Sequence, residues 1–316
     1  MTHIIELNQV YKTFGETKAV INLNLQIPKG VLCGFLGPNG AGKSTTIRMI
    51  MSIIHADSGT VNVLGTSALA AKDQIGYLPE ERGVYRKMKV GTFIQYVANL
   101  KGMRGHRLQK EIDNWLSRID LPNAKKKRCE ELSKGMQQKV QFLTAIIHDP
   151  SLIILDEPFS GLDPVNAQII GGIIDELHAS GKTILFSTHV LQQAEEICDR
   201  IVMIDKGKKV IDDQIETVRS TFNPNIVQVS PIDFATDFTT FNGVLKQFES
   251  KRNDAIDLHL DSTVEPTDVI QAIASSIKLR SIKTVQPSLT EIFISQVGMH
   301  QGSKAAEETR EQLTNE

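Results

Sequence analysis

The sequence has few cysteines, no long apolar run and almost no net charge. Its three cysteines among 316 residues are Cys33, Cys129 and Cys198. They are far apart and lack the spacing of metal ligands, so we expect reduced thiols rather than a disulfide framework. No apolar run approaches the roughly 18 residues that cross a bilayer, and the N-terminal residues do not resemble a signal peptide. The net charge of −2 gives no indication of a nucleic-acid partner.

The composition is ordinary for a globular protein, with 41% hydrophobic and 23% charged residues. A chain of 316 residues exceeds the usual size of a single hydrophobic core. We therefore expect one large domain and one small domain.

The most informative segment is residues 37–45, which complete the pattern G-x-x-x-x-G-K-[ST] between an apolar run at 31–36 and a helical pattern at 45–54. Glycines let the backbone N–H groups face phosphates, and the start of the following helix adds a positive dipole end. Lys43 is expected to reach the β- and γ-phosphates, and the Ser44 hydroxyl to bind Mg²⁺. The pattern therefore predicts a nucleoside triphosphate site formed by Gly37, Pro38, Asn39, Gly40, Ala41, Gly42, Lys43, Ser44 and Thr45.

A second segment supplies carboxylates. The apolar run 152–155 has the pattern of a strand buried on both faces, and Asp156 and Glu157 follow it. By itself this arrangement is typical of any strand that reaches solvent. Next to a phosphate site, Asp156 is expected to hold Mg²⁺ directly or through water, and Glu157 to orient and deprotonate the attacking water.

A third apolar run, residues 183–188, leads to His189. A histidine after a strand is more often structural than catalytic. Here, however, three apolar runs all end in residues suited to phosphate or metal chemistry. Open α/β sheets bind ligands in the crevice at the carboxyl ends of their strands, so we expect these three ends to form one site.

With these motifs, residues 3–220 resemble the ATP-binding cassette family of ATPases. The deciding addition is the run Leu-Ser-Lys-Gly-Met-Gln-Gln at 132–138, which resembles the signature sequence of that family. The resemblance implies that Ser133 and Gly135 contact the γ-phosphate held by a second cassette, so that two ATP molecules lie between two subunits, here expected to be a homodimer. It also implies that Tyr11 stacks on adenine and that His189 is the switch histidine.

The chain departs from the family pattern at two places. Glu80 occupies the position where most cassettes carry glutamine, and an ionised carboxylate accepts hydrogen bonds but cannot donate them. The sequence leaves open whether Glu80 binds Mg²⁺ or points away. In the signature, Lys134 replaces the usual first glycine and Met136 a glutamine. An additional cation for the site and a solvated surface lysine are both compatible with Lys134.

The predicted fold is α/β: a P-loop NTPase cassette with a mixed sheet, a helical subdomain, and a small α+β C-terminal domain. The cassette is expected to span residues 1–220, with the helical subdomain at about 88–145. After a linker at Asn223–Asn225, strand and helix patterns start again and define an accessory domain at 221–298. The tail, 299–316, is polar and is expected to be disordered or a frayed helix.

The resemblance predicts an ATPase subunit that powers export through a separate integral-membrane permease, and that lies at the cytoplasmic side of the membrane through that permease. ATP and Mg²⁺ are the expected cofactors, and Lys43, Glu157 and His189 the expected catalytic residues. Two alternatives stay open. One is a soluble assembly or translation factor, although such relatives usually carry two cassettes in one chain. The other is a low-turnover regulatory module, which Glu80 favours and the intact Glu157 and His189 disfavour.

Overall fold

The computed structural model describes residues 2–81, 83–221, 226–233, 236–249, 255–261, 263–285 and 287–301. Contacts divide the chain into a larger unit, built mainly from residues up to Ile215, and a smaller unit from Glu216 to Ser295. Arg82, the expected linker at Asn223–Asn225 and the tail beyond residue 301 lie outside the described residues. No helix in the described part of the chain is long and apolar enough to cross a membrane.

The larger unit is built on a six-stranded mixed sheet in the order β5-β6-β7-β3-β8-β9. All neighbouring strands pair in parallel except β9, which is antiparallel to β8. The central strands β3, β6 and β7 are buried along their whole length, as the apolar runs within them predict. The strand bounds are β3 Leu32–Leu36, β5 Ile75–Leu78, β6 Leu152–Asp156, β7 Thr183–Thr188, β8 Arg200–Asp205 and β9 Lys208–Gln214.

An antiparallel layer of β2 (Thr17–Pro28), β1 (His3–Phe14) and β4 (Ser58–Val63) packs against this sheet. Alternating apolar residues of β1 and β2 form the inner face of the layer, as expected for a sheet that is buried on one side. They share one hydrophobic core with helix α1 (Lys43–Ile50) and with Phe35 of β3. This core holds the start of α1 at the carboxyl end of β3.

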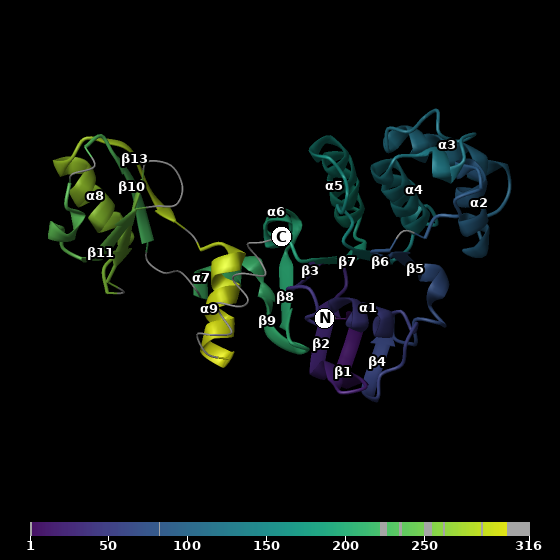
Figure 1. The fold of residues 1–316 in the computed structure, drawn as a ribbon, viewed down its shortest axis with the longest axis horizontal. Coiled ribbons are helices and arrows are strands. Elements are labelled where there is room, and N and C mark those ends of the chain that lie inside the picture. Colours follow the sequence, from purple (N-terminus) through teal and green to yellow (C-terminus); the bar gives the residue numbers. More distant parts are fainter. Residues whose placement is uncertain are drawn as a thin grey trace. The chain divides into compact units, whose positions relative to one another are not determined.

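Helices form the remainder of the unit. Figure 1 shows α2 (Val90–Leu100), α3 (His106–Arg118) and α4 (Lys134–Ile146) grouped together, away from the antiparallel layer. This group corresponds to the helical region expected at about 88–145. Helix α5 (Pro164–Ala179) begins where the Asp163 side chain accepts from the Asn166 N–H at 2.9 Å. The other helix of this unit is α6 (Leu191–Ile197), and short 3₁₀ turns lie at Lys72–Gln74 and Cys129–Glu131. Helix α7 (Ile215–Thr221) lies in the smaller unit except for its first residue.

The smaller unit is a four-stranded antiparallel sheet in the order β11-β12-β10-β13, with one face covered by α8 (Pro266–Ser276). The strands are β10 Ile226–Pro231, β11 Val244–Glu249, β12 Ile256–Leu260 and β13 Leu279–Val285, and a 3₁₀ turn lies at Phe238–Thr240. The last helix, α9 (Leu289–Gln301), begins with the capping box that the sequence predicts: Ser288 Oγ accepts from the Glu291 N–H, and Glu291 Oε2 accepts from the Ser288 N–H.

Candidate functional site

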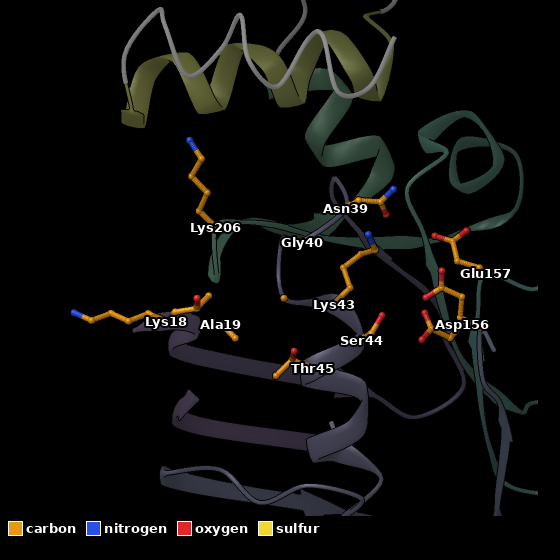
Figure 2. A pocket seen from close by; sticks show the side chains of 13 residues that line it. Lys18, Ala19, Asn39, Gly40, Lys43, Ser44, Thr45, Asp156, Glu157 and Lys206 are labelled. Atoms are coloured by element: carbon orange, nitrogen blue, oxygen red, sulfur yellow. The ribbon is translucent and has the colours of Figure 1, made fainter. Parts of the chain in front are cut away.

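A cavity of about 450 Å³ lies where β3 passes into α1. Figure 2 shows Asp156 and Glu157 on one side of it, Lys18 and Lys206 on the other, and Lys43 with Ser44 between them. One end of the cavity is therefore acidic and the other basic. The lining residues are Thr17, Lys18, Ala19, Asn39, Gly40, Gly42, Lys43, Ser44, Thr45, Glu80, Asp156, Glu157 and Lys206.

The phosphate loop has a backbone that only glycine accommodates at two positions. Gly37 and Gly42 have φ values of 148° and 107°, and an added Cβ would lie 2.1 Å from the Ile204 carbonyl oxygen and 2.4 Å from that of Ala19. The loop is thus clamped between β8 and β2. The Lys43 ammonium is bent back over it and donates to the carbonyl oxygens of Gly37 at 2.7 Å and Pro38 at 3.2 Å.

Asp156, at the carboxyl end of β6, is 3% exposed. Burial raises the pKa of its carboxyl group to about 6, and the charges of Glu80 and Glu157 act in the same direction; the neighbouring Ser187 hydroxyl and, to a smaller extent, Lys43 oppose them. Its Oδ1 is buried with no hydrogen-bond partner among the residues that the structure describes. A buried, unsatisfied carboxylate oxygen beside the Ser44 hydroxyl is the hard oxygen donor set that Mg²⁺ prefers.

Glu157 and His189 form a connected pair. Glu157 Oε1 lies 2.6 Å from His189 Nδ1 and accepts from the His189 N–H at 2.9 Å, while Oε2 accepts from the Thr188 hydroxyl at 3.0 Å. With Nδ1 donating to the carboxylate, Nε2 of His189 is the acceptor nitrogen. Glu157 has a φ of 52°, a left-handed backbone conformation that is uncommon for a side-chain-bearing residue and is frequent at functional sites.

The expected base-stacking residue, Tyr11, is not among the described residues that line the cavity. It pairs with Ser58 of β4 and is 39% exposed. A second aromatic side chain, Phe14, lies opposite Thr17, which does line the cavity, and it is 50% exposed. No sequence motif marks Phe14; its place at the end of β1, next to the turn at Gly15, is the one signal that the sequence offers.

Ser133 and Gly135 lie at the start of α4 and, among the described residues, do not line the cavity of their own chain. Ser133 Oγ caps the helix by accepting from the Met136 N–H at 3.3 Å. A Cβ on Gly135 would lie 3.4 Å from the carbonyl oxygen of Gly161, so the signature touches the loop that follows the carboxylates. Ser133 is exposed and Gly135 is half-buried.

Four of the described residues that line the cavity are not marked by any sequence motif. They are Thr17, Lys18, Ala19 and Lys206, which come from the antiparallel layer and from the β8–β9 turn.

Among the described residues, no group of three or more His, Cys, Asp or Glu side chains is arranged to hold a metal ion by itself. A bound Mg²⁺ would therefore need oxygens from a nucleotide and from water as well, as is usual for this ion.

Two family models match the chain: one described as "ABC transporter" over residues 20–160, and one described as the C-terminal domain of DrrA1-3-like ATP-binding proteins over residues 214–297. The uncharacterised ABC transporter ATP-binding protein YhaQ of Bacillus subtilis is 38% identical, with 93% of this chain and 99% of the relative covered. The daunorubicin/doxorubicin resistance ATP-binding protein DrrA of Streptomyces peucetius is 28% identical, with 98% and 97% covered. A Nod factor export ATP-binding protein I of Cupriavidus pinatubonensis is also 28% identical, with 94% and 92% covered.

Solved structures agree. An ATP-binding subunit of an ABC transporter matches with a TM-score of 0.65 and 27% identity, covering 69% of this chain and 93% of the other. The cbiO1 protein of Clostridium perfringens, described as part of the ABC transporter complex cbiONQ, has the same fold, with a TM-score of 0.61 at 23% identity over 70% and 92% of the two chains. The fold is thus the α/β cassette that the sequence predicts, and the phosphate loop belongs to an ATP-binding domain. The chain is a member of the ABC transporter ATP-binding protein family, with a DrrA-like C-terminal domain.

Proposed function

We propose that this chain hydrolyses ATP as its Mg²⁺ complex, and that binding and hydrolysis drive export through a separate membrane permease. One observation carries the proposal: Lys43, Ser44, Asp156 and Glu157 converge on one cavity. These residues supply the cation for the phosphates, the oxygen donors for the metal and the base for the water.

The role of each residue follows from its surroundings. The Lys43 ammonium, now bound to two loop carbonyls, turns to the β- and γ-phosphates when a triphosphate displaces it. Ser44 and Asp156 hold Mg²⁺, which neutralises phosphate charge when bound. Glu157 orients the attacking water and accepts its proton, and His189 fixes the Glu157 carboxylate through the 2.6 Å contact at Nδ1. Glu80 lines the same cavity, and we assign it to the metal side of the site.

The second half of each site comes from another copy of the chain. Ser133 and Gly135 are remote from the cavity of their own chain yet lie at the exposed start of α4. We propose that MgATP joins two copies so that Ser133 and Gly135 of one complete the phosphate site of the other. Nucleotide binding would close this homodimer and hydrolysis would reopen it.

An exposed aromatic patch on the helical region is proposed as the contact with the permease. Tyr85, Tyr96 and Leu100 are 54%, 43% and 63% exposed, and the Tyr85 ring centroid lies 5.8 Å from those of Tyr96 and Phe93. Exposed, clustered aromatic side chains are typical of protein interfaces. Docking there would hold the chain at the cytoplasmic side of the membrane. Export as the direction is supported by the names of the DrrA and Nod factor relatives.

The hydrolytic role is tested by steady-state phosphate release from MgATP for the wild type and for Glu157→Gln. We expect the substitution to lower the rate by about 10²- to 10⁴-fold, the usual contribution of a general base, while ATP binding is retained. Glu111→Gln, an exposed change on α3, is the control and should keep the wild-type rate. Equal rates for the wild type and Glu157→Gln would exclude Glu157 as the base. Tight ATP binding with negligible wild-type turnover would instead favour a regulatory module.

The transport role is tested separately, by purifying the tagged chain from its own cells in mild detergent. Recovery together with a multi-span membrane protein supports the proposal and identifies the chain that determines the substrate. Recovery with ribosomes would favour an assembly or translation factor instead.

A further inference from the structure

Gln141 is buried in the middle of α4, and its side chain makes hydrogen bonds to a loop outside that helix. The residue is 4% exposed, and its side chain reaches the loop that follows β5. Its Nε2 donates to the carbonyl oxygen of Glu81 at 3.2 Å and makes a longer contact of 3.5 Å with that of Pro79. Its Oε1 accepts from the Gly83 N–H at 3.2 Å. One side chain therefore holds three backbone groups of the 79–83 loop.

This set of contacts requires an amide. The loop presents two carbonyl acceptors and one N–H donor, and only asparagine or glutamine offers both an NH₂ and a carbonyl from one planar group. Gln141 is buried whereas Glu81 and Gly83 are exposed, so removing its amide takes away the hydrogen bonds that tie the loop to α4 and leaves these backbone groups to water. The geometry also fixes which way the amide faces.

The loop that Gln141 holds carries Glu80, which lies between the two residues whose carbonyl oxygens Gln141 contacts. Glu80 lines the nucleotide cavity beside Asp156, and its charge contributes to the raised pKa of Asp156. Gln141 itself is not among the described residues that line the cavity. Any effect of Gln141 on the site is therefore indirect, and Glu80 is the cavity residue on the loop that it holds.

The other end of the connection is the signature segment. Gln141 lies two turns after Ser133, which caps the same helix, α4. Helix α4 is rigidly seated on β5 as well, because an added Cβ on Gly76 would lie 2.0 Å from the Ala145 carbonyl oxygen. A displacement of α4 is thus transmitted to the 79–83 loop through the hydrogen bonds of the buried Gln141 side chain.

We propose that Gln141 is a positioning residue that ties Glu80 to the signature helix, so that the place of the Glu80 carboxylate at the metal side of the nucleotide site depends on the position of α4. This inference rests on the proposed function, in which Glu80 meets MgATP. If Gln141 has this role, the Mg²⁺ dependence of ATP hydrolysis varies with the position of α4, the helix whose N-terminus is proposed to meet the second copy of the chain.

Two substitutions test the hydrogen bonds of Gln141. Gln141→Leu has a similar size and removes all three contacts. Gln141→Glu keeps an acceptor for the Gly83 N–H but places a carboxylate against the carbonyl oxygens of Pro79 and Glu81. For both we expect the Mg²⁺ concentration for half-maximal ATP hydrolysis to rise about tenfold, as is typical when a residue supporting a metal site is removed. In the Glu80→Ala background, neither change should shift it further, because the residue through which Gln141 acts is gone.

The matched control is Gln137→Leu. Gln137 lies one turn earlier on the same face of α4 and donates from its Nε2 to the carbonyl oxygens of Cys129 and Leu132, away from the 79–83 loop. It removes a glutamine amide of the same size; because Gln137 belongs to the signature run, it should lower the rate of hydrolysis while the Mg²⁺ concentration for half-maximal hydrolysis stays at the wild-type value. Equal shifts for Gln137→Leu and Gln141→Leu, or shifts that persist in the Glu80→Ala background, would overturn the positioning role.

Hydrogen exchange of the Gly83 amide gives a readout that is independent of ATP hydrolysis. We expect faster exchange in Gln141→Leu and wild-type exchange in Gln137→Leu, because only the former loses the acceptor for this N–H. Unchanged exchange in Gln141→Leu would refute the connection itself. Faster exchange in a chain whose wild type shows no turnover would refute the proposed function while leaving the connection in place.

Discussion

Phe14 and Tyr11 lie three residues apart on β1 but have different neighbours. Phe14 pairs with the cavity-lining Thr17, whereas Tyr11 pairs with Ser58. Stacking of a base on an aromatic side chain contributes about 1–3 kcal/mol by alanine substitution. If Phe14 supplies this stacking, Phe14→Ala should weaken ATP binding by about tenfold, and Tyr11→Ala should have little effect. Titration with a fluorescent ATP analogue measures both.

Lys12 is a further neighbour of the Phe14 ring. The Lys12 ammonium lies 5.3 Å from the centre of the Phe14 ring and also pairs with Asp57 at 2.7 Å, so one face of the ring already has a cationic neighbour. Lys12→Ala should therefore change ATP affinity less than Phe14→Ala. A larger loss of ATP affinity in Tyr11→Ala than in Phe14→Ala would support the expectation that Tyr11 stacks on adenine.

His148 is the residue for which the structure gives the clearest pH dependence. Burial, with the nearby Lys101 ammonium adding to it, lowers the pKa of His148 from 6.5 to about 4; the hydrogen bond from its ring to the Ile75 carbonyl oxygen opposes this. The folded chain therefore resists protonation of His148 more than the unfolded chain does. The stability that follows is complete above pH 6.5 and is lost as the pH falls from 6.5 towards 4.

For this reason His148→Gln should reduce the acid sensitivity of the larger unit. Glutamine can still donate to the Ile75 carbonyl oxygen but has no proton to bind. The difference in stability lost between pH 7 and pH 4.5 should be on the order of 2 kcal/mol, measured by thermal unfolding at each pH. His55→Gln, at an exposed histidine, is the control. Identical acid profiles for the wild type and His148→Gln would show that the buried imidazole is not responsible.

The sequence identified those site residues that follow directly from local patterns. Lys43, Ser44, Asp156 and Glu157 each follow an apolar strand, and β3 and β6 both pair with β7, so parallel pairing brings their carboxyl ends to one edge. Lys18 and Lys206 could not be found in this way. They reach the cavity because the antiparallel layer and the β8–β9 turn fold over the phosphate loop, and no local pattern encodes that packing.

At the scale of elements, the same distinction holds between strands and their packing. The apolar runs within β3, β6 and β7 predict buried central strands, and the structure has these strands next to one another in the middle of the sheet. The close seating of α4 on β5 depends on a single small residue. Gly76 lies in a short strand with ordinary backbone, so only the tertiary structure reveals why a side chain does not fit there.

Gly76→Ala should therefore destabilise the larger unit. The added Cβ would lie 2.0 Å from the Ala145 carbonyl oxygen and 3.0 Å from Pro150 Cγ, so α4 must move away from β5. Overpacking of this kind costs about 1–3 kcal/mol, occasionally more. We expect a lower unfolding midpoint in urea and, because α4 also holds the 79–83 loop, faster exchange of the Gly83 amide.

Gly171→Ala is the matched control for that experiment. Gly171 lies inside α5, and nothing is within 4 Å of the position of an added Cβ. Replacing a glycine inside a helix by alanine should stabilise the chain by about 0.5–1 kcal/mol. The two glycine-to-alanine changes are therefore expected to have opposite signs. A neutral Gly76→Ala would mean that α4 is not tightly seated on β5.

At the scale of the whole molecule, the chain combines a cassette with a small antiparallel unit that has its own core. The length of the chain predicts one large and one small domain, and the strand and helix patterns that start again after Asn225 predict where the small one begins. Assembly is different, because the role that we propose for the signature residues requires a second copy. Ser133 serves its own chain as a helix cap and lies outside its own nucleotide cavity, so its expected role towards a phosphate needs a partner molecule.

The dimer can be tested without disturbing the cap. In the Glu157→Gln background, which should retain ATP, we expect MgATP to convert the chain from its mass of 35.0 kDa to twice that value in light scattering. Adding Ser133→Asp keeps a good N-cap acceptor but places a carboxylate against the γ-phosphate of the other copy, so the dimer should be lost. Ser133→Asn has the same shape and capping ability without the charge, and should retain far more of the dimer. Equal dimerisation of the Asp and Asn variants would contradict a contact between Ser133 and phosphate. A monomer in Glu157→Gln with MgATP would contradict the nucleotide sandwich as a whole, and the signature would then have to be explained as a helix cap alone.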